Sequence, residues 1–293
     1  MIVFPGCKIN LGLNVGDQRA DGFHNLETVF YPIPLYDALE IVRAPVDSNE
    51  AIRFSCSGLQ IDGNPEQNLC VKAYRLLKND FKELPPVQMH LHKTIPMGAG
   101  LGGGSSNGAA ALKLLNDQFR LGLREDQLRT YALELGSDCP FFIINEPCFA
   151  TGRGDQLQRM DLDLSAYSIT LINPGIHVNT GWAFTQLRLR KSKNSQTFNL
   201  KTLTQLPINE WKQQLVNDFE AVVFEQHPEI ETIKTQLYRA GALYASMSGS
   251  GSTVFGIFPK NQLPVLQLPD HYFIKTLLLD QVPVTNFQGV KDR

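Results

Sequence analysis

Hydrophobic and polar residues alternate along much of the first part of the chain, as expected for half-buried strands. In residues 7–14 the side chains of Ile9 and Leu11 fall on one face of the predicted strand. Lys8 and Asn10 fall on the other face. That face is either solvated or turned toward a ligand, and the pattern alone leaves both open. Further strands are predicted at residues 28–31, 38–42, 51–55 and 87–91.

Helical spacing of hydrophobic residues appears later. Residues 68–77 begin at Asn68, an N-cap type of residue, and residues 124–135 end at Gly136. Between residue 136 and residue 143 the sequence predicts a tight turn that carries Asp138, followed by an apolar strand. The mixed order of strands and helices indicates an α+β protein.

The composition of the chain changes near residue 160, and the second half again contains both strands and helices. Strands are predicted at residues 168–173 and 253–258, and a helix at 229–243. Residues 188–206 are polar and basic, which predicts a loop or a mobile excursion. We expect two domains, residues 1–160 and 161–293.

The segment between the predicted strand at 87–91 and the next helix is rich in glycine. Six glycines fall between Gly98 and Gly108, and an Ala/Leu run that favours helix follows them. Glycine lets backbone N–H groups approach a ligand closely, and a helix N-terminus adds unpaired N–H groups and a favourable dipole. We therefore predict a phosphate-binding loop rather than a flexible linker.

Three common phosphate motifs do not fit this loop. The spacing Gly98-x-Gly100-x-x-Gly103 matches the dinucleotide fingerprint, but the second strand and acidic residue of a Rossmann unit do not follow. The Walker sequence Gly-Lys-Ser/Thr is missing after the glycines, and so are the protein-kinase motifs. An oxidoreductase that uses this fingerprint is therefore disfavoured.

A second small-residue segment lies near the end of the chain. Six of the seven residues 246–252 are Ser or Gly, more than a plain turn requires. We predict a loop that packs against the phosphate loop across a cleft between the domains.

Composition narrows the classes of partner. The chain has 293 residues and a net charge of −2, and lacks a basic stripe, so we expect no nucleic-acid partner. Five widely spaced cysteines without a C-x-x-C pair favour reduced thiols over disulfides or zinc. The sequence also predicts no signal peptide and no membrane partner, since no apolar run approaches the ~18 residues of a membrane span. We expect a cytoplasmic protein.

Together these segments resemble the GHMP kinases, a family that includes galactokinase, homoserine kinase and mevalonate kinase. The order matches: a strand with Lys8, the glycine loop, and the late loop. The resemblance is strongest to the branch that acts on a cytidylyl-methylerythritol in the non-mevalonate route to isoprenoid precursors. The distinguishing segments are Lys8-Ile-Asn-Leu11, Arg19-Ala-Asp-Gly-Phe-His24, Gly102-Gly-Gly-Ser-Ser-Asn107, Gly136-Ser-Asp-Cys-Pro-Phe-Phe142, Gly152-Arg-Gly154 and Asn217-Asp-Phe-Glu220.

The resemblance implies a two-domain α+β fold, with a left-handed βαβ crossover in the N-terminal domain and a ferredoxin-like C-terminal domain. It implies ATP-dependent transfer of the γ-phosphoryl group to the 2-hydroxyl of the methylerythritol moiety, with Asp138 as the base and Lys8 as its partner. Another GHMP kinase, acting on homoserine or mevalonate, and a non-catalytic nucleotide sensor on the same fold are the alternatives.

The resemblance also assigns binding residues. The ATP-binding residues would be Asn68, Lys93, Pro96, Met97, Gly98, Ala99, Gly100, Leu101, Gly102, Gly103, Gly104, Ser105, Ser106 and Asn107. The substrate-binding residues would be Asn10, Phe23, His24, Thr180, Phe184, Ser248 and Gly249. Cytosine would stack between Phe23 and Phe184, with His24 at its edge. Mg²⁺ would be held mainly by phosphates and water, and the enzyme would be a monomer or a homodimer.

Overall fold

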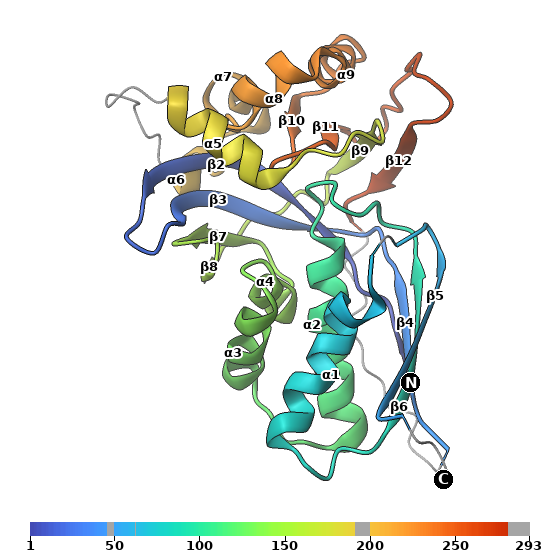
Figure 1. Cartoon of the computed structure of the whole chain (residues 1–293). Coiled ribbons are helices and arrows are strands. Elements are labelled where there is room, and N and C mark those ends of the chain that lie inside the picture. The colour runs from blue at the N-terminus through green and yellow to red at the C-terminus, as the bar shows by residue number, and fades with distance from the viewer. Residues whose placement is uncertain (46–49, 62, 191–199, 281–293) are drawn as a thin grey trace.

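The computed structural model describes residues 1–45, 50–61, 63–190 and 200–280, apart from the side chain of residue 203. Three four-stranded sheets and a set of helices make up this part of the chain. Helices α1 to α4 gather in one half of the molecule and helices α5 to α9 in the other, with the ribbon of β2 and β3 passing between them (Figure 1). Part of the predicted excursion at 188–206 lies outside the described residues.

The first sheet belongs to the N-terminal half and has the strand order β1-β4-β6-β5. Its strands are β1 Ile2–Val3, β4 Ala38–Arg43, β5 Ile52–Gly58 and β6 Val87–Lys93. Strands β5 and β6 are parallel and are connected through the short helix η1 Pro65–Gln67 and through α1 Leu69–Asp80, which gives a βαβ unit. The handedness of this crossover stays a prediction.

The second sheet has the order β2-β3-β7-β8 and is antiparallel throughout. Its strands are β2 Cys7–Gln18, β3 His24–Ile33, β7 Cys148–Thr151 and β8 Gln156–Arg159. The predicted strand at residues 7–14 is confirmed. A register shift between Leu11 and Leu13 leaves Gly12 at a φ of 69°, a β-bulge in the middle of β2.

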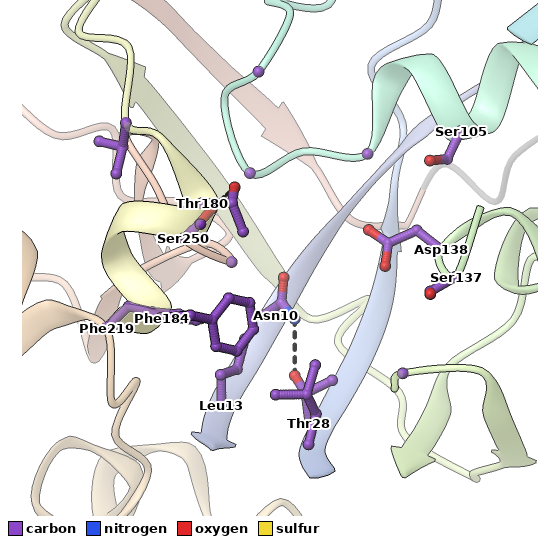
Figure 2. A pocket seen from close by; sticks show the side chains of 18 of the residues that line it. Asn10, Leu13, Thr28, Ser105, Ser137, Asp138, Thr180, Phe184, Phe219 and Ser250 are labelled. Carbon is purple, nitrogen blue, oxygen red and sulfur yellow. Dashed lines mark hydrogen bonds between the residues drawn. The ribbon is translucent and has the colours of Figure 1, made fainter. Parts of the chain in front are cut away.

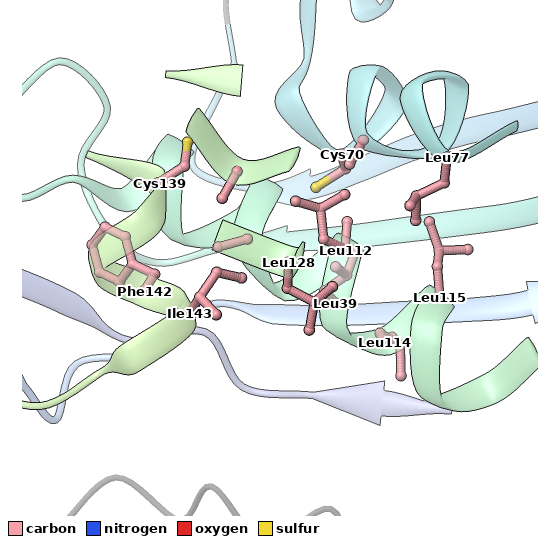
Figure 3. Packing of buried hydrophobic residues seen from close by; sticks show 14 of the residues in the cluster. Leu39, Cys70, Leu77, Leu112, Leu114, Leu115, Leu128, Cys139, Phe142 and Ile143 are labelled. Carbon is pink, nitrogen blue, oxygen red and sulfur yellow. The ribbon is translucent and has the colours of Figure 1, made fainter. Parts of the chain in front are cut away.

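Three helices complete the N-terminal half: α2 Gly103–Phe119, α3 Glu125–Leu135 and α4 Cys139–Ile144. Figure 3 shows how Leu112 and Leu115 of α2 pack among Leu39, Leu77 and Leu128 of the sheet and the neighbouring helices, all of them buried in one hydrophobic cluster.

The strand predicted after Asp138 is wrong, because this segment is the helix α4. A short apolar run cannot be assigned to strand or helix by its periodicity. Pro140 in the first turn fits a helix, where the missing N–H costs nothing. The helix ends at Asn145, which adopts the left-handed conformation with a φ of 55°.

The third sheet has the order β10-β11-β9-β12, and its neighbouring strands are antiparallel. Its strands are β9 Tyr167–Asn173, β10 Tyr244–Met247, β11 Val254–Pro259 and β12 Phe273–Leu278. This is the strand order of a ferredoxin-like βαββαβ unit. The connection between β11 and β12, residues 260–272, contains no helix, so the unit lacks its second one.

The helices of the C-terminal half lie between β9 and β10 in the chain. They are α5 Thr180–Arg190, α6 Leu200–Leu203, η2 Ile208–Glu210, α7 Trp211–Gln214, α8 Glu220–Gln226 and α9 Pro228–Arg239. Two expectations are corrected here. Residues 246 and 247 lie at the end of strand β10 rather than in the predicted loop at 246–252, and the predicted loop at 188–206 contains the end of α5 and all of α6.

The halves share one hydrophobic cluster. Ile9 and Leu11 of β2 are completely buried in it with Leu171 of β9 and Phe255 of β11. Strand β2 therefore packs against the C-terminal sheet although it precedes all of the N-terminal helices. The division of the chain at residue 160 stays a prediction.

Candidate active site

The glycine-rich segment leaves β6, crosses the top of the N-terminal half and enters α2 at Gly103. Gly98, Gly100 and Gly102 have φ angles of 61°, 77° and 69°, a region that glycine enters without a steric cost. No side chain caps the N-terminus of α2, whose N-cap is Gly102. The first N–H groups of the helix can therefore bind an anion.

A buried ion pair supports this loop from below. Lys93 donates a hydrogen bond to Asp37 and another, of 3.1 Å, to Asn107 Oδ1. The other carboxylate oxygen of Asp37 accepts hydrogen bonds from the N–H groups of Thr94 (2.7 Å) and Ile95 (3.0 Å). The side chains of Lys93 and Asp37 are fully buried, so both act as supports of the loop. The predicted contact of Lys93 with ATP stays a prediction.

Lys8 and Asp138 lie together although 130 residues separate them in the sequence. The Nζ atom of Lys8 is 3.5 Å from Oδ2 of Asp138. The Lys8 side chain is 5% exposed and that of Asp138 is 37% exposed, so the carboxylate is open to the cleft while the amine is enclosed. Strand β2 positions Lys8, and Asp138 is the N-cap residue of α4.

Further contacts fix the Lys8 amine. Its Nζ atom donates a 2.6 Å hydrogen bond to Asn10 Oδ1 and lies 4.8 Å from the centre of the Phe30 ring. A cation over an aromatic face is attracted by the ring quadrupole. The backbone N–H of Lys8 donates to the carbonyl of Leu101, which joins β2 directly to the glycine loop.

The late loop, residues 248–253, packs against the glycine loop. Ser248 Oγ donates a 2.8 Å hydrogen bond to the carbonyl of Gly100 and accepts one of 3.2 Å from the N–H of Asn10. The N–H of Thr253 donates to the carbonyl of Ala99 at 3.2 Å. The predicted contact between the two small-residue loops is therefore confirmed.

An aromatic group lies at the other end of the site. The rings of His24 and Phe184 are stacked, with centroids 5.2 Å apart and an angle of 13° between the planes. The rings of Phe184 and Phe219 also pack edge to face, with centroids 4.9 Å apart. The Phe23 ring is half exposed. The guanidinium carbon of Arg153 lies over it, 4.7 Å from the centroid of the ring. His24 therefore covers one face of Phe184, a ring that is expected to stack on cytosine.

A cleft of about 960 Å³ connects these groups. Figure 2 shows Asp138 and Ser105 on one side of it and Phe184, Thr180 and Ser250 on the other. Its volume lies at the upper end of the range for small-molecule sites. The lining includes the predicted residues Lys8, Asn10, Phe23, His24, Pro96, Met97, Gly98, Ala99, Gly100, Gly102, Gly103, Gly104, Ser105, Asp138, Thr180, Phe184 and Gly249.

Comparison with known proteins decides the family. The sequence matches the GHMP kinases N terminal domain over residues 68–146 and the GHMP kinases C terminal domain over residues 205–266. A 4-diphosphocytidyl-2-C-methyl-D-erythritol kinase of Bacteroides thetaiotaomicron is 52% identical, over 90% of this chain and 94% of the relative. This chain belongs to the 4-diphosphocytidyl-2-C-methyl-D-erythritol kinase family. A kinase of the same name from Cytophaga hutchinsonii is 49% identical, over 88% of this chain and 92% of the relative.

Solved structures agree with this membership. The crystal structure of a 4-(cytidine 5'-diphospho)-2C-methyl-D-erythritol kinase superposes with a TM-score of 0.76 at 28% identity, covering 89% of this chain and 91% of that one. The mevalonate kinase of Methanococcus jannaschii has a TM-score of 0.64 at 13% identity, over 88% of this chain and 90% of that one, a likeness of fold. The expected α+β GHMP kinase fold is confirmed, and membership in this kinase family implies the use of ATP.

The remaining predicted residues of this family member lie beside the cleft. Leu101, Ser106 and Asn107 are buried in or behind the loop, and the Ser248 hydroxyl is engaged between Gly100 and Asn10. Asn68 caps α1 by accepting a 2.9 Å hydrogen bond from the N–H of Cys70. The roles of these residues stay predictions.

A second, smaller cavity of about 330 Å³ adjoins the glycine loop of the kinase. Its walls include Asn68, Leu69 and Phe54, and it shares Met97 and Gly104 with the loop. The walls are largely apolar with a few amide groups, which suits a flat heterocycle.

Sequence reasoning missed several residues that line the main cleft. They are Thr28, Phe30, Arg153, His177, Arg188 and Ser250. The turn at residues 152–154 and the small-residue loop at 246–252 were visible in the sequence, and they carry Arg153 and Ser250. Nothing in the sequence pattern distinguishes Thr28 or Phe30 from ordinary strand residues, because their position depends on the pairing of β3 with β2.

Two features are absent from the described residues, a metal-binding cluster and a membrane-spanning helix. No group of three or more His, Cys, Asp or Glu side chains there could hold a metal ion. None of the helices in that part of the chain is long and apolar enough to cross a membrane.

Proposed function

We propose that this chain transfers the γ-phosphoryl group of ATP to the 2-hydroxyl of 4-diphosphocytidyl-2-C-methyl-D-erythritol. The observation that carries the proposal is the Lys8–Asp138 pair, with its carboxylate open to the cleft and its amine enclosed. A sensor would need the phosphate loop but has no use for a carboxylate held in this way.

Asp138 would act as the base. As the substrate oxygen forms its bond to the γ-phosphorus, the hydroxyl proton passes to the Asp138 carboxylate and the bond from phosphorus to the ADP oxygen breaks. A tertiary alcohol is a weak nucleophile, so a carboxylate within reach of its proton helps. Lys8 would orient that carboxylate and offset charge on the transferring group.

The glycine loop and the α2 N-terminus would hold the ATP phosphates through backbone N–H groups. Figure 2 shows Ser105 and Asp138 facing the same space. Their oxygens are of the kind that Mg²⁺ prefers. A small number of protein oxygens is enough for an ion that is held mostly by phosphate oxygens and water. Such an ion neutralises charge on the phosphates. The adenosine part of ATP would bind in the smaller, largely apolar cavity beside Asn68, which agrees with the predicted role of Asn68 in ATP binding.

The cytidine end would bind at Phe23, His24 and Phe184. His24 Nδ1 lies 3.1 Å from the carbonyl of Gly16. A carbonyl accepts only, so Nδ1 carries a proton, and in the Nδ1-protonated tautomer Nε2 is an acceptor. The exocyclic amine of cytosine is a donor, whereas uracil offers an oxygen there. This tautomer therefore supports selection of cytosine.

The test is ADP release by the purified protein with Mg-ATP. We expect turnover with 4-diphosphocytidyl-2-C-methyl-D-erythritol and none with the same polyol lacking its cytidylyl group, with homoserine or with mevalonate. Turnover with homoserine or mevalonate would still support kinase activity but would refute the proposed substrate. ATP binding without turnover on any of them would favour the nucleotide sensor. A cytoplasmic location and a monomeric or homodimeric state also stay predictions.

A further inference from the structure

A chain of buried hydrogen bonds runs from the bulge of β2 to the Lys8 amine. Thr28 Oγ1 donates to the carbonyl of Gly12 at 2.6 Å. Asn10 Nδ2 donates to Thr28 Oγ1 at 2.9 Å, as Figure 2 shows, and Lys8 Nζ donates to Asn10 Oδ1 at 2.6 Å. Thr28, Asn10 and Lys8 are 1%, 2% and 4% exposed, so water does not compete with these bonds.

The two ends of this chain fix the direction of every bond within it. The Gly12 carbonyl can only accept, so it takes the single proton of the Thr28 hydroxyl. The hydroxyl oxygen is then an acceptor toward Asn10. The Lys8 ammonium can only donate, so it requires the amide oxygen of Asn10. A reversed Asn10 amide would place its NH₂ group against the ammonium.

The bulge in β2 places the Gly12 carbonyl where Thr28 can reach it. In the pairing of β2 with β3, Leu11 lies opposite Val29 and Leu13 lies opposite Thr28, so Gly12 is the extra residue of the bulge. Its φ of 69° is open to glycine, and a Cβ atom there would lie 2.9 Å from Leu215 Cδ1. The bulge therefore requires glycine at this position.

We propose that Thr28 is a positioning residue for phosphoryl transfer. By holding the Asn10 amide in one orientation, it keeps the Lys8 amine 3.5 Å from the Asp138 carboxylate. Thr28 acts through Asn10 and Lys8. This inference rests on the proposed function of the Lys8–Asp138 pair, and the experiment below separates the two.

The test compares Thr28→Val with Thr28→Ser. Valine matches threonine in shape but cannot accept or donate, whereas serine keeps the hydroxyl. We expect kcat of Thr28→Val to fall about tenfold, because the Asn10 amide loses the acceptor that fixes its orientation. The KM for ATP should stay within twofold, and Thr28→Ser should keep at least half of the wild-type kcat. Equal kcat for valine and wild type, or an equal loss for serine, would overturn the inference.

A double-mutant cycle separates positioning from a general loss of packing. If Thr28 acts through Asn10, then Thr28→Val should lower kcat by less than about twofold in an Asn10→Ala background. A full tenfold loss in that background would show that Thr28 acts by another route. If Thr28→Val fails to fold, Thr28→Ala takes its place in the same cycle.

The control for stability is Thr170→Val in β9, which removes another buried threonine hydroxyl, one that makes a 2.9 Å contact with the hydroxyl of the exposed Thr276. We expect a loss of kcat in Thr28→Val and none in Thr170→Val. Equal loss of kcat in both would overturn the inference. Wild-type protein with no turnover would refute the proposed function itself, while an active wild type with an equally active valine variant would refute only the role of Thr28.

Discussion

Gly100 is the point of closest approach between the two loops that form the cleft. A Cβ atom at this position would lie 1.9 Å from the carbonyl oxygen of Ser248 and 3.3 Å from that of Gly251. The obstacle is backbone on both sides, so rotation of a side chain cannot relieve it. We predict that Gly100→Ala separates the loops, destabilises the protein and weakens ATP binding.

The size of the effect follows from the contacts that would be lost. Contacts of Cβ below 3.0 Å essentially do not occur, so the Ser248 backbone must move by about 1 Å. That shift breaks the hydrogen bonds from Ser248 Oγ to Gly100 and from Thr253 to Ala99, each worth about 1 kcal/mol. The φ of 77° adds about 1–2 kcal/mol for alanine. We expect a loss of about 3–4 kcal/mol in the free energy of unfolding.

The assay is urea unfolding together with an ATP titration. Gly104→Ala is the matched control for stability, because a Cβ atom there has its nearest neighbour, Met97 Cε, at 3.8 Å and the residue is helical. Alanine should be neutral or slightly stabilising at Gly104. The Kd for ATP should rise at least tenfold in Gly100→Ala, which corresponds to about 1.4 kcal/mol. Unfolding free energies of Gly100→Ala and Gly104→Ala that agree within about 1 kcal/mol would refute the reasoning.

Three further predictions concern the site and the buried thiols. Asp138→Asn should bind ATP normally and lose most of its turnover, at least about a hundredfold as for other general bases, measured by ADP release. His24→Ala should raise KM for the cytidylyl substrate about tenfold, with little change for ATP, and reduce the preference for cytidylyl over uridylyl substrate, measured by steady-state kinetics with both. Burial raises the pKa of the thiols of Cys7, Cys70 and Cys139 to about 12 and that of Cys148 to about 11. A thiol whose pKa is higher in the folded than in the unfolded state adds to the free energy of unfolding. This contribution is complete below the unfolded thiol pKa near 9 and is lost as the pH rises toward 11–12. Urea midpoints should therefore fall progressively above pH 9.

Each of these predictions has an outcome that contradicts it. Unchanged turnover in Asp138→Asn would remove Asp138 as the base. Equal weakening of ATP and of the cytidylyl substrate in His24→Ala would indicate a general structural loss instead of a lost base contact. Urea midpoints that hold constant from pH 8 to pH 11 would show that the four thiols do not titrate differently in the two states.

Much of the local structure follows from the sequence. Alternation in residues 7–14 and helical spacing in residues 68–77 each correspond to an observed element, β2 and α1. One exception is residues 139–144, where six consecutive helical residues from Cys139 to Ile144 are all buried and therefore show no periodicity. A helix that is apolar on every side has the same composition as a buried strand.

The site is harder to predict because its key contacts depend on tertiary structure. The glycines at 98–104 identify a phosphate loop by composition, since the chemistry of the loop resides in the backbone. The pairing of Lys8 with Asp138 depends on the arrangement of β2 beside α4, which no local pattern encodes. Thr28 joins the site through the register of β3 against a bulged strand. One residue of slippage would turn it to the other face of the sheet.

The contact between the loops also explains why small residues gather at two distant places in the chain. Gly249 has a φ of 58°, and a Cβ atom there would lie 3.3 Å from Gly100 Cα and 3.5 Å from Asn10 Oδ1. Gly100 and Gly249 therefore form one backbone-to-backbone contact, and Ser248 bridges it to β2. The close approach of the two backbones accounts for the small residues of the late loop. The N-terminal glycine loop and the C-terminal serine loop thus constrain each other, and substitution at either one changes the shape of the same cleft.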